Sequence, residues 1–125
     1  MEKVIETPDA PPAIGPYSQG MRFGNMVITS GQLPINPETG EISENTKEQA
    51  HQCLRNVKAV LEAAGSNMSR VKKATVFVRD MNEFSNINEV YKQYFSVPFP
   101  ARSLVEVSRL PKDVKVEIEV TATVD

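Results

Sequence analysis

Histidine and cysteine are almost absent from this sequence of 125 residues, which contains one of each, His51 and Cys53, and no tryptophan. A single cysteine excludes a disulfide within the chain, so we expect a reducing, cytoplasmic location. Positions two apart on a helix do not face each other, which makes His51 and Cys53 a poor pair of metal ligands. We therefore expect no metal and no cofactor, and chemistry that uses arginine, glutamate, tyrosine, serine, asparagine, backbone groups and water.

Neither sign of charge dominates, because 14 lysines and arginines stand against 16 aspartates and glutamates, giving a net charge of -2. The basic residues form no block, so a nucleic acid is not an expected partner. No apolar run is long enough to cross a bilayer, and the N-terminus lacks the basic-then-apolar layout of a signal peptide. We expect no membrane partner, and we expect residues 1–125 to form one domain.

The spacing of apolar residues predicts an α+β fold. Gly24-Asn25 between two apolar segments predicts a tight hairpin of residues 21–23 and 26–30. Apolar stripes at helical spacing predict one helix from about Thr46 to Gly65 and a second over residues 83–95. Further strands are expected at residues 71–79, 102–107 and 114–124. This order predicts a mixed sheet with two helices packed on one face.

The last two strands suggest a site. If they pair as an antiparallel hairpin, Arg102 and Leu104 share a face with Glu117 and Glu119. An arginine binds planar anions through two hydrogen bonds, and a glutamate in a confined site can position water or move a proton. One interpretation is therefore a site for a small carboxylic acid. The other is a set of cross-strand ion pairs on a solvated face.

Several long blocks of the chain resemble the Rid family of reactive-intermediate/imine deaminases, also called the YjgF family, in its RidA subgroup. The blocks are AIGPYSQG at 13–20, ITSGQLP at 28–34, NVKAVLEAAG at 56–65, KATVFVRDM at 73–81 and FPARSLVEVSRLPKDVKVEIE at 99–119. The resemblance covers nearly the whole chain. It implies a chorismate-mutase-like α+β fold and a homotrimer, in which the sheets form a central barrel and substrate clefts lie between adjacent subunits.

The resemblance also implies roles for particular residues. Arg102 of the PARS motif binds the substrate carboxylate, and Glu117 of the VEIE motif is linked to the catalytic water. The other pocket residues that it implies are Tyr17 of IGPY, Ser30 and Gly31 of SGQ, and Asn88 of the second helix. Each of these also has a structural interpretation, as a packed aromatic, a strand end or an exposed helix residue. Many RidA members carry a cysteine where this chain has Leu104, whose backbone we expect to help orient the substrate.

The activity that the resemblance implies is that of a 2-iminobutanoate/2-iminopropanoate deaminase, which hydrolyses reactive 2-imino acids to 2-keto acids and ammonia. Orientation of the imine by Arg102 and acid–base help from Glu117 would suffice for such a reaction. Two other functions stay open. One is a regulatory protein that binds a small carboxylate without turnover. The other is an endoribonuclease, for which an acidic chain with a single histidine is poorly suited.

Overall fold

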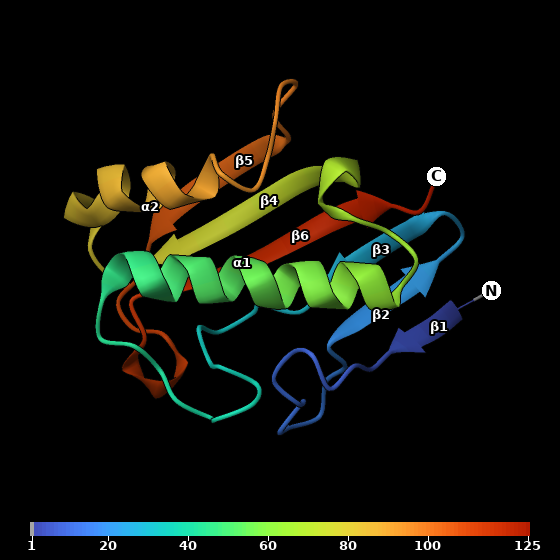
Figure 1. Cartoon of the computed structure of the whole chain (residues 1–125), viewed down its shortest axis with the longest axis horizontal. Coiled ribbons are helices and arrows are strands. Elements are labelled where there is room, and N and C mark those ends of the chain that lie inside the picture. The colour runs from blue at the N-terminus through green and yellow to red at the C-terminus, as the bar shows by residue number, and fades with distance from the viewer. Residues whose placement is uncertain (1) are drawn as a thin grey trace.

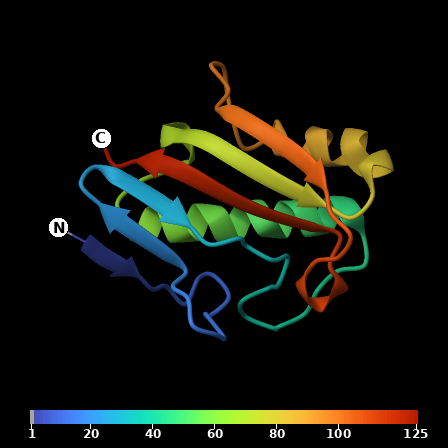
Figure 2. The same cartoon turned by 180° about the vertical axis from the view of Figure 1, so that it is seen from behind.

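Six strands form one sheet in the order β1-β2-β3-β6-β4-β5 in the computed structural model, which describes residues 2–125 (Figure 1). The strands are β1 (Glu2–Ile5), β2 (Gly20–Phe23), β3 (Met26–Thr29), β4 (Val71–Val78), β5 (Ala101–Glu106) and β6 (Val116–Thr123). The helices are α1 (Thr46–Ala63) and α2 (Phe84–Tyr91), with short 3-10 turns at Met68–Arg70, Met81–Glu83 and Pro111–Asp113. Both helices cover the same face of the sheet (Figures 1 and 2), which confirms the predicted layers.

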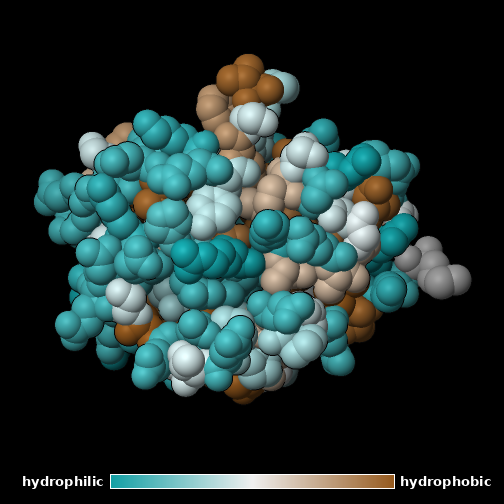
Figure 3. Space-filling model, viewed as in Figure 1, coloured by the Kyte–Doolittle hydropathy of each residue, from teal (hydrophilic) through white to brown (hydrophobic). Residues whose placement is uncertain are grey.

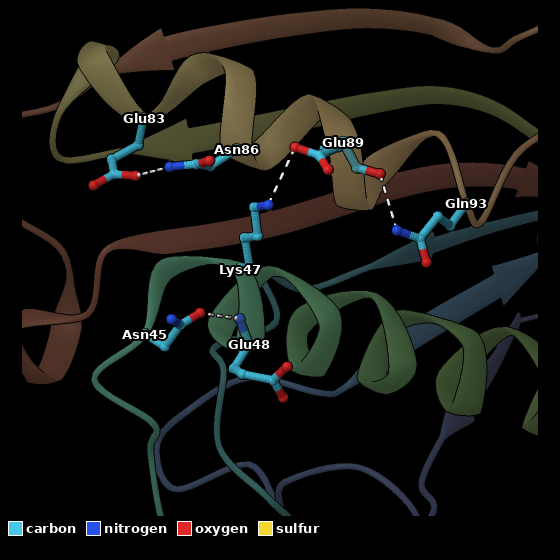
Figure 4. Close-up of polar contacts among 7 residues, drawn as sticks. All are labelled: Asn45, Lys47, Glu48, Glu83, Asn86, Glu89 and Gln93. Carbon is cyan, nitrogen blue, oxygen red and sulfur yellow. Dashed lines mark hydrogen bonds and ion pairs between the residues drawn. The ribbon is translucent and has the colours of Figure 1, made fainter.

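The core lies between α1 and the sheet. The helix begins where the side chain of Asn45 accepts a hydrogen bond of 3.0 Å from the backbone N–H of Glu48 (Figure 4), which satisfies one of the free donors at a helix start. Its apolar stripe is completely buried against the sheet. The stripe consists of Ala50, Cys53, Leu54, Val57, Val60 and Leu61. Burial of this stripe, more than helix propensity, holds α1 in place.

Polar contacts fix α2 beside α1. An ion pair of 3.1 Å joins Lys47 Nζ to Glu89 Oε2 (Figure 4). One helical turn further along α1, His51 Nδ1 lies 2.8 Å from the hydroxyl of Tyr94, which follows α2. The ion pair is exposed and contributes little to stability, so its main effect is on the register between the helices. The expected helix over residues 83–95 is thus shorter than predicted, because α2 ends at Tyr91.

The predicted pairing of the last two strands is wrong. β5 pairs with β4 in parallel, and β4 lies between β5 and β6. The connection from β4 to β5 contains α2, and a helical crossover of this kind joins parallel neighbours. The loop after β5 therefore spans a strand instead of closing a hairpin. The other predicted hairpin, β2 with β3 around Gly24-Asn25, is confirmed.

The two faces of the molecule differ in character. The side covered by helices is predominantly hydrophilic (Figure 3). The opposite face of the sheet carries exposed apolar side chains on four strands, and Ile28 and Val105 are 41% and 40% exposed there. Val4 and Phe23 add to this uncovered face. No helix in residues 2–125 is long and apolar enough to cross a membrane.

Candidate functional site

Arg102 is held by one face of α2. Its Nη1 donates a hydrogen bond of 2.6 Å to Asn88 Oδ1, and its Cζ lies 4.8 Å from the ring centre of Tyr91 and 5.9 Å from that of Phe84. Positions 84, 88 and 91 lie on successive turns of a helix, so they meet the same neighbour. The structure therefore brings together two of the predicted site residues, Arg102 and Asn88.

No carboxylate among residues 2–125 pairs with Arg102. Arg102 is half-buried, and the ion pairs found within residues 2–125 are Lys47 with Glu89 and Arg109 with Asp113. A guanidinium has five N–H donors, and Asn88 takes one of them. A half-buried arginine with free donors suits a small anion such as a carboxylate.

The prediction that Arg102 shares a face of the sheet with Glu117 is wrong. Arg102 pairs with Ala74, which pairs in turn with Val120, and both of these are buried under the helices. Residues paired across a sheet share a face, so Arg102 points to the helix side. Glu117 is three positions before Val120 and points to the other side. Arg102 was assigned to the face of Glu117 because β5 was predicted to pair with β6, whereas it pairs with β4.

Glu117 packs directly against Gly31. A Cβ atom at position 31 would lie only 2.7 Å from Glu117 Cδ, so the carboxylate occupies space that only a glycine leaves open. The contact is set by a short bridge between backbones. Gln32 N donates to Ile118 O at 2.8 Å, and Ile118 N donates to Gln32 O at 3.2 Å. A second group of predicted residues is thus assembled around Glu117.

Burial raises the pKa of Glu117, and the negative charge of Glu119 raises it further. Both causes disfavour the ionised carboxylate. A carboxyl group whose pKa moves toward neutrality accepts and returns a proton more readily near physiological pH. Glu117 is therefore protonated more readily than an exposed glutamate.

Buried polar side chains hold the segment that carries Ser30 and Gly31. The amide of Asn56, which is fully buried, donates to Leu33 O at 2.9 Å and to Ile35 O at 3.0 Å. On the other side, the Ser30 hydroxyl donates to Ser18 O at 2.5 Å. Because this hydroxyl is already used inside the chain, Ser30 helps to place the segment next to Tyr17.

Tyr17 and Gly31 line a hollow of about 270 Å³. Its walls are mainly apolar and include Ile14, Leu33, Ile35 and Ile42. Tyr17 is 50% exposed, so its ring is available to a ligand or to a second chain. A larger hollow of about 490 Å³ is also lined by Tyr17, and neither of the two hollows is lined by Arg102 or Glu117.

The remaining sequence-predicted residues lie outside these two groups. Leu104 is half-buried on the helix side of β5, two residues after Arg102. Cys53 is fully buried, as the helical stripe predicted, and burial together with the charge of Glu117 raises the pKa of its thiol. Among residues 2–125, no group of three or more histidines, cysteines, aspartates or glutamates is placed to hold a metal ion.

Sequence reasoning missed the aromatic contacts of Arg102. Phe84 and Tyr91 belong to the apolar stripe that predicted a helix over residues 83–95, and that stripe gave them no partner. The signal was present, since Asn88 interrupts their apolar stripe at a position that helical spacing places between them. A polar residue on the buried face of a short helix indicates a polar partner beneath it.

The fold and the two groups of residues define an α+β protein with a half-buried arginine on one side of its sheet and a partly buried carboxylate on the other. The sequence model of the family described as Endoribonuclease L-PSP matches residues 7–124. The chain belongs to this family, which includes the YjgF and RidA proteins.

Three similar proteins match nearly the whole chain. A protein of Escherichia coli K12 named 2-iminobutanoate/2-iminopropanoate deaminase is 55% identical, with 98% of each chain covered. The crystal structure of Escherichia coli TdcF with bound serine is 52% identical, with 97% of this chain and 98% of that chain covered and a TM-score of 0.93. The crystal structure of the YjgF gene product of Escherichia coli is 53% identical, with the same coverage and a TM-score of 0.93.

Proposed function

We propose that this protein hydrolyses 2-iminobutanoate and 2-iminopropanoate to the corresponding 2-keto acids and ammonia. The observation that carries the proposal is the half-buried guanidinium of Arg102, which Asn88 holds and which no carboxylate of the chain neutralises. A 2-imino acid offers the carboxylate that such an arginine binds. The Escherichia coli relative at 55% identity is named for this activity, and the TdcF structure holds serine, which also carries a carboxylate.

We further propose that the two groups of residues meet between neighbouring copies of a homotrimer. Arg102 and Asn88 would come from one copy, and Glu117, Gly31, Ser30 and Tyr17 from the next. Two observations support this assembly: the groups face opposite ways within one chain, and the sheet has an uncovered apolar face. Uncovered apolar surface of this kind is typical of protein interfaces. The mass in solution should be that of three chains, and a stable monomer would contradict the assembly.

The mechanism that we propose needs only this chain's own groups and water. Arg102 binds the carboxylate of the imino acid and fixes the position of the imine carbon, with backbone groups at Leu104 helping to orient it. The carboxylate of Glu117 takes a proton from water as the water oxygen bonds to that carbon. The electron pair of the carbon–nitrogen double bond moves to the nitrogen, which takes the proton back from Glu117 to give an amino alcohol. The hydroxyl proton of this intermediate then passes through Glu117 to the amino nitrogen as the carbon–nitrogen bond breaks, so that ammonia leaves and the hydroxyl oxygen becomes the keto oxygen. Residues 1–125 would act as one domain, in the cytoplasm and without a cofactor.

The decay of an imine tests this function. An amino-acid oxidase generates the 2-imino acid, and its disappearance is followed with and without the protein. The wild type should accelerate the decay and Arg102→Ala should not. Arg109→Ala is the matched control, because Arg109 is exposed and pairs only with Asp113. It should retain the wild-type rate.

Two other outcomes would overturn the proposal. If the wild type binds 2-oxobutanoate but does not accelerate imine decay, the protein is a carboxylate-binding regulator. If purified wild type leaves imines untouched and cleaves RNA, and Arg102→Ala abolishes the cleavage, the protein is an endoribonuclease. RNA cleavage that survives this substitution and disappears on further purification indicates contamination.

A further inference from the structure

The ring of Tyr91 is close to two other flat groups. Its centre is 4.8 Å from the guanidinium carbon of Arg102 and 4.6 Å from the ring centre of Phe95. The side chain is only 6% exposed. This stack places a delocalised cation against an aromatic face with little water between them, a setting in which their attraction is strengthened.

The hydroxyl of Tyr91 does not contribute to this contact. Within residues 2–125 it is the one buried side-chain nitrogen or oxygen that has no hydrogen-bond partner. A buried hydroxyl without a partner weakens the fold, so the ring is what Tyr91 contributes inside the chain. Phenylalanine would provide the same ring without that cost.

The ring supplies a restraint that Asn88 cannot. The single hydrogen bond from Arg102 Nη1 to Asn88 Oδ1 fixes one nitrogen but allows the guanidinium plane to turn about that bond. A planar guanidinium stacks on an aromatic face, which removes this rotation. The remaining N–H groups then point in a fixed direction, as recognition of a carboxylate through two hydrogen bonds requires.

We propose that Tyr91 is a positioning residue, whose ring orients the guanidinium of Arg102 for carboxylate binding. The consequence for imine turnover rests on the proposed function. The orientation of Arg102 does not, because it follows from the contact between the ring and the guanidinium within the chain.

Three variants separate the ring from the hydroxyl and from general packing. Tyr91→Phe keeps the ring and should leave KM within about twofold of the wild type, with an equal or higher Tm. Tyr91→Leu removes the ring and should raise KM for the imine and Kd for 2-oxobutanoate by about three- to tenfold, with a smaller change in kcat. Phe95→Leu is the matched control, because it removes the other ring of the stack and should leave KM unchanged.

NMR supplies a readout that does not depend on a ligand. The ring current of Tyr91 should shift the side-chain protons of Arg102 equally in the wild type and in Tyr91→Phe, and the shifts should be smaller in Tyr91→Leu, where only the more distant ring of Phe84 remains. If Tyr91→Leu does not fold, Tyr91→Met is used instead, because a flexible methionine fills irregular space in a core. Should the wild type neither bind 2-oxobutanoate nor hydrolyse imines, the proposed function fails, and these shifts still decide the role of Tyr91.

The proposal is overturned by any of three results. In the first, Tyr91→Leu keeps the wild-type KM, Kd and Arg102 shifts. In the second, Tyr91→Phe loses as much affinity as Tyr91→Leu, which would assign the effect to the hydroxyl. In the third, Phe95→Leu raises KM equally, which would reduce Tyr91 to a packing residue.

Discussion

Arg102 and Glu117 point to opposite faces of the same sheet. Arg102 is aligned through Ala74 with Val120 on the helix side, whereas Glu117 is aligned with Phe77 on the uncovered side. Two side chains separated by the thickness of a sheet cannot hold one small molecule between them. If both act on the same imino acid, they act from different copies of the chain.

Mixing two inactive variants tests this arrangement. Arg102→Ala keeps Glu117, and Glu117→Gln keeps Arg102, so neither variant alone should form a complete site. In a mixed ring of three copies, one of the three sites combines an intact Arg102 with an intact Glu117. After unfolding and joint refolding of equal amounts, we expect about one quarter of the wild-type rate of imine decay.

The control for this experiment is a mixture of separately refolded variants, which should stay inactive until subunits exchange. A jointly refolded mixture that forms trimers without regaining activity would contradict the shared site. It would indicate that each chain completes its site alone.

Gly31→Ala should displace Glu117 without unfolding the chain. The new Cβ would collide with the end of the flexible Glu117 side chain, which moves at little cost. Misplacement of a reacting group by about 1 Å can cost about 100-fold, so we expect kcat to fall by roughly this factor while Tm changes little. Gly15→Ala is the control, because its Cβ would lie 3.5 Å from the nearest atoms, which is ordinary contact. A fully active Gly31→Ala would remove Glu117 from the mechanism.

Glu117→Gln should make the protein more stable at neutral pH and less active. Burial raises the pKa of Glu117 from its ordinary value of 4.5, so the folded state holds the proton more tightly than the unfolded state does. The stability of the wild type relative to the variant therefore falls as pH rises through the raised pKa. In thermal unfolding, Glu117→Gln should have the higher Tm at about pH 8. The Tm values of the variant and the wild type should converge toward about pH 4. A constant difference in Tm across this range would contradict the shift.

Asn56→Ala should destabilise the fold through the segment that carries Gly31. The substitution leaves the carbonyl groups of Leu33 and Ile35 without their donor in a partly buried place. Loss of such a partner costs about 1–3 kcal/mol, measurable as a lower midpoint in urea unfolding. Lys58→Ala, an exposed substitution on the same helix, should leave the midpoint unchanged. If the two substitutions changed the urea midpoint equally, the hydrogen bonds of Asn56 to Leu33 and Ile35 would not stabilise the fold.

Local patterns predicted two elements that decide their own structure. The stripe of α1 and the Gly24-Asn25 turn follow from spacing and from backbone preference, and both are confirmed. The pairing of β5 failed, because alternation along a strand says which residues share a face but not which strand lies beside it. The helical connection through α2 was the better guide, and it favoured a parallel pair with β4.

For the candidate site, the chain itself supplied the chemistry: an arginine and a glutamate in motifs that resemble those of a known family, with no second histidine and no cysteine pair to compete with them. Tertiary structure alone decided which groups meet. It set Arg102 against Asn88 and Tyr91, and Glu117 against Gly31, because strand order and the crossover through α2 fix the face to which each side chain points. The sequence alone determines which side chain stands at each position. The direction in which that side chain points depends on which strands, far apart in the chain, pair with each other.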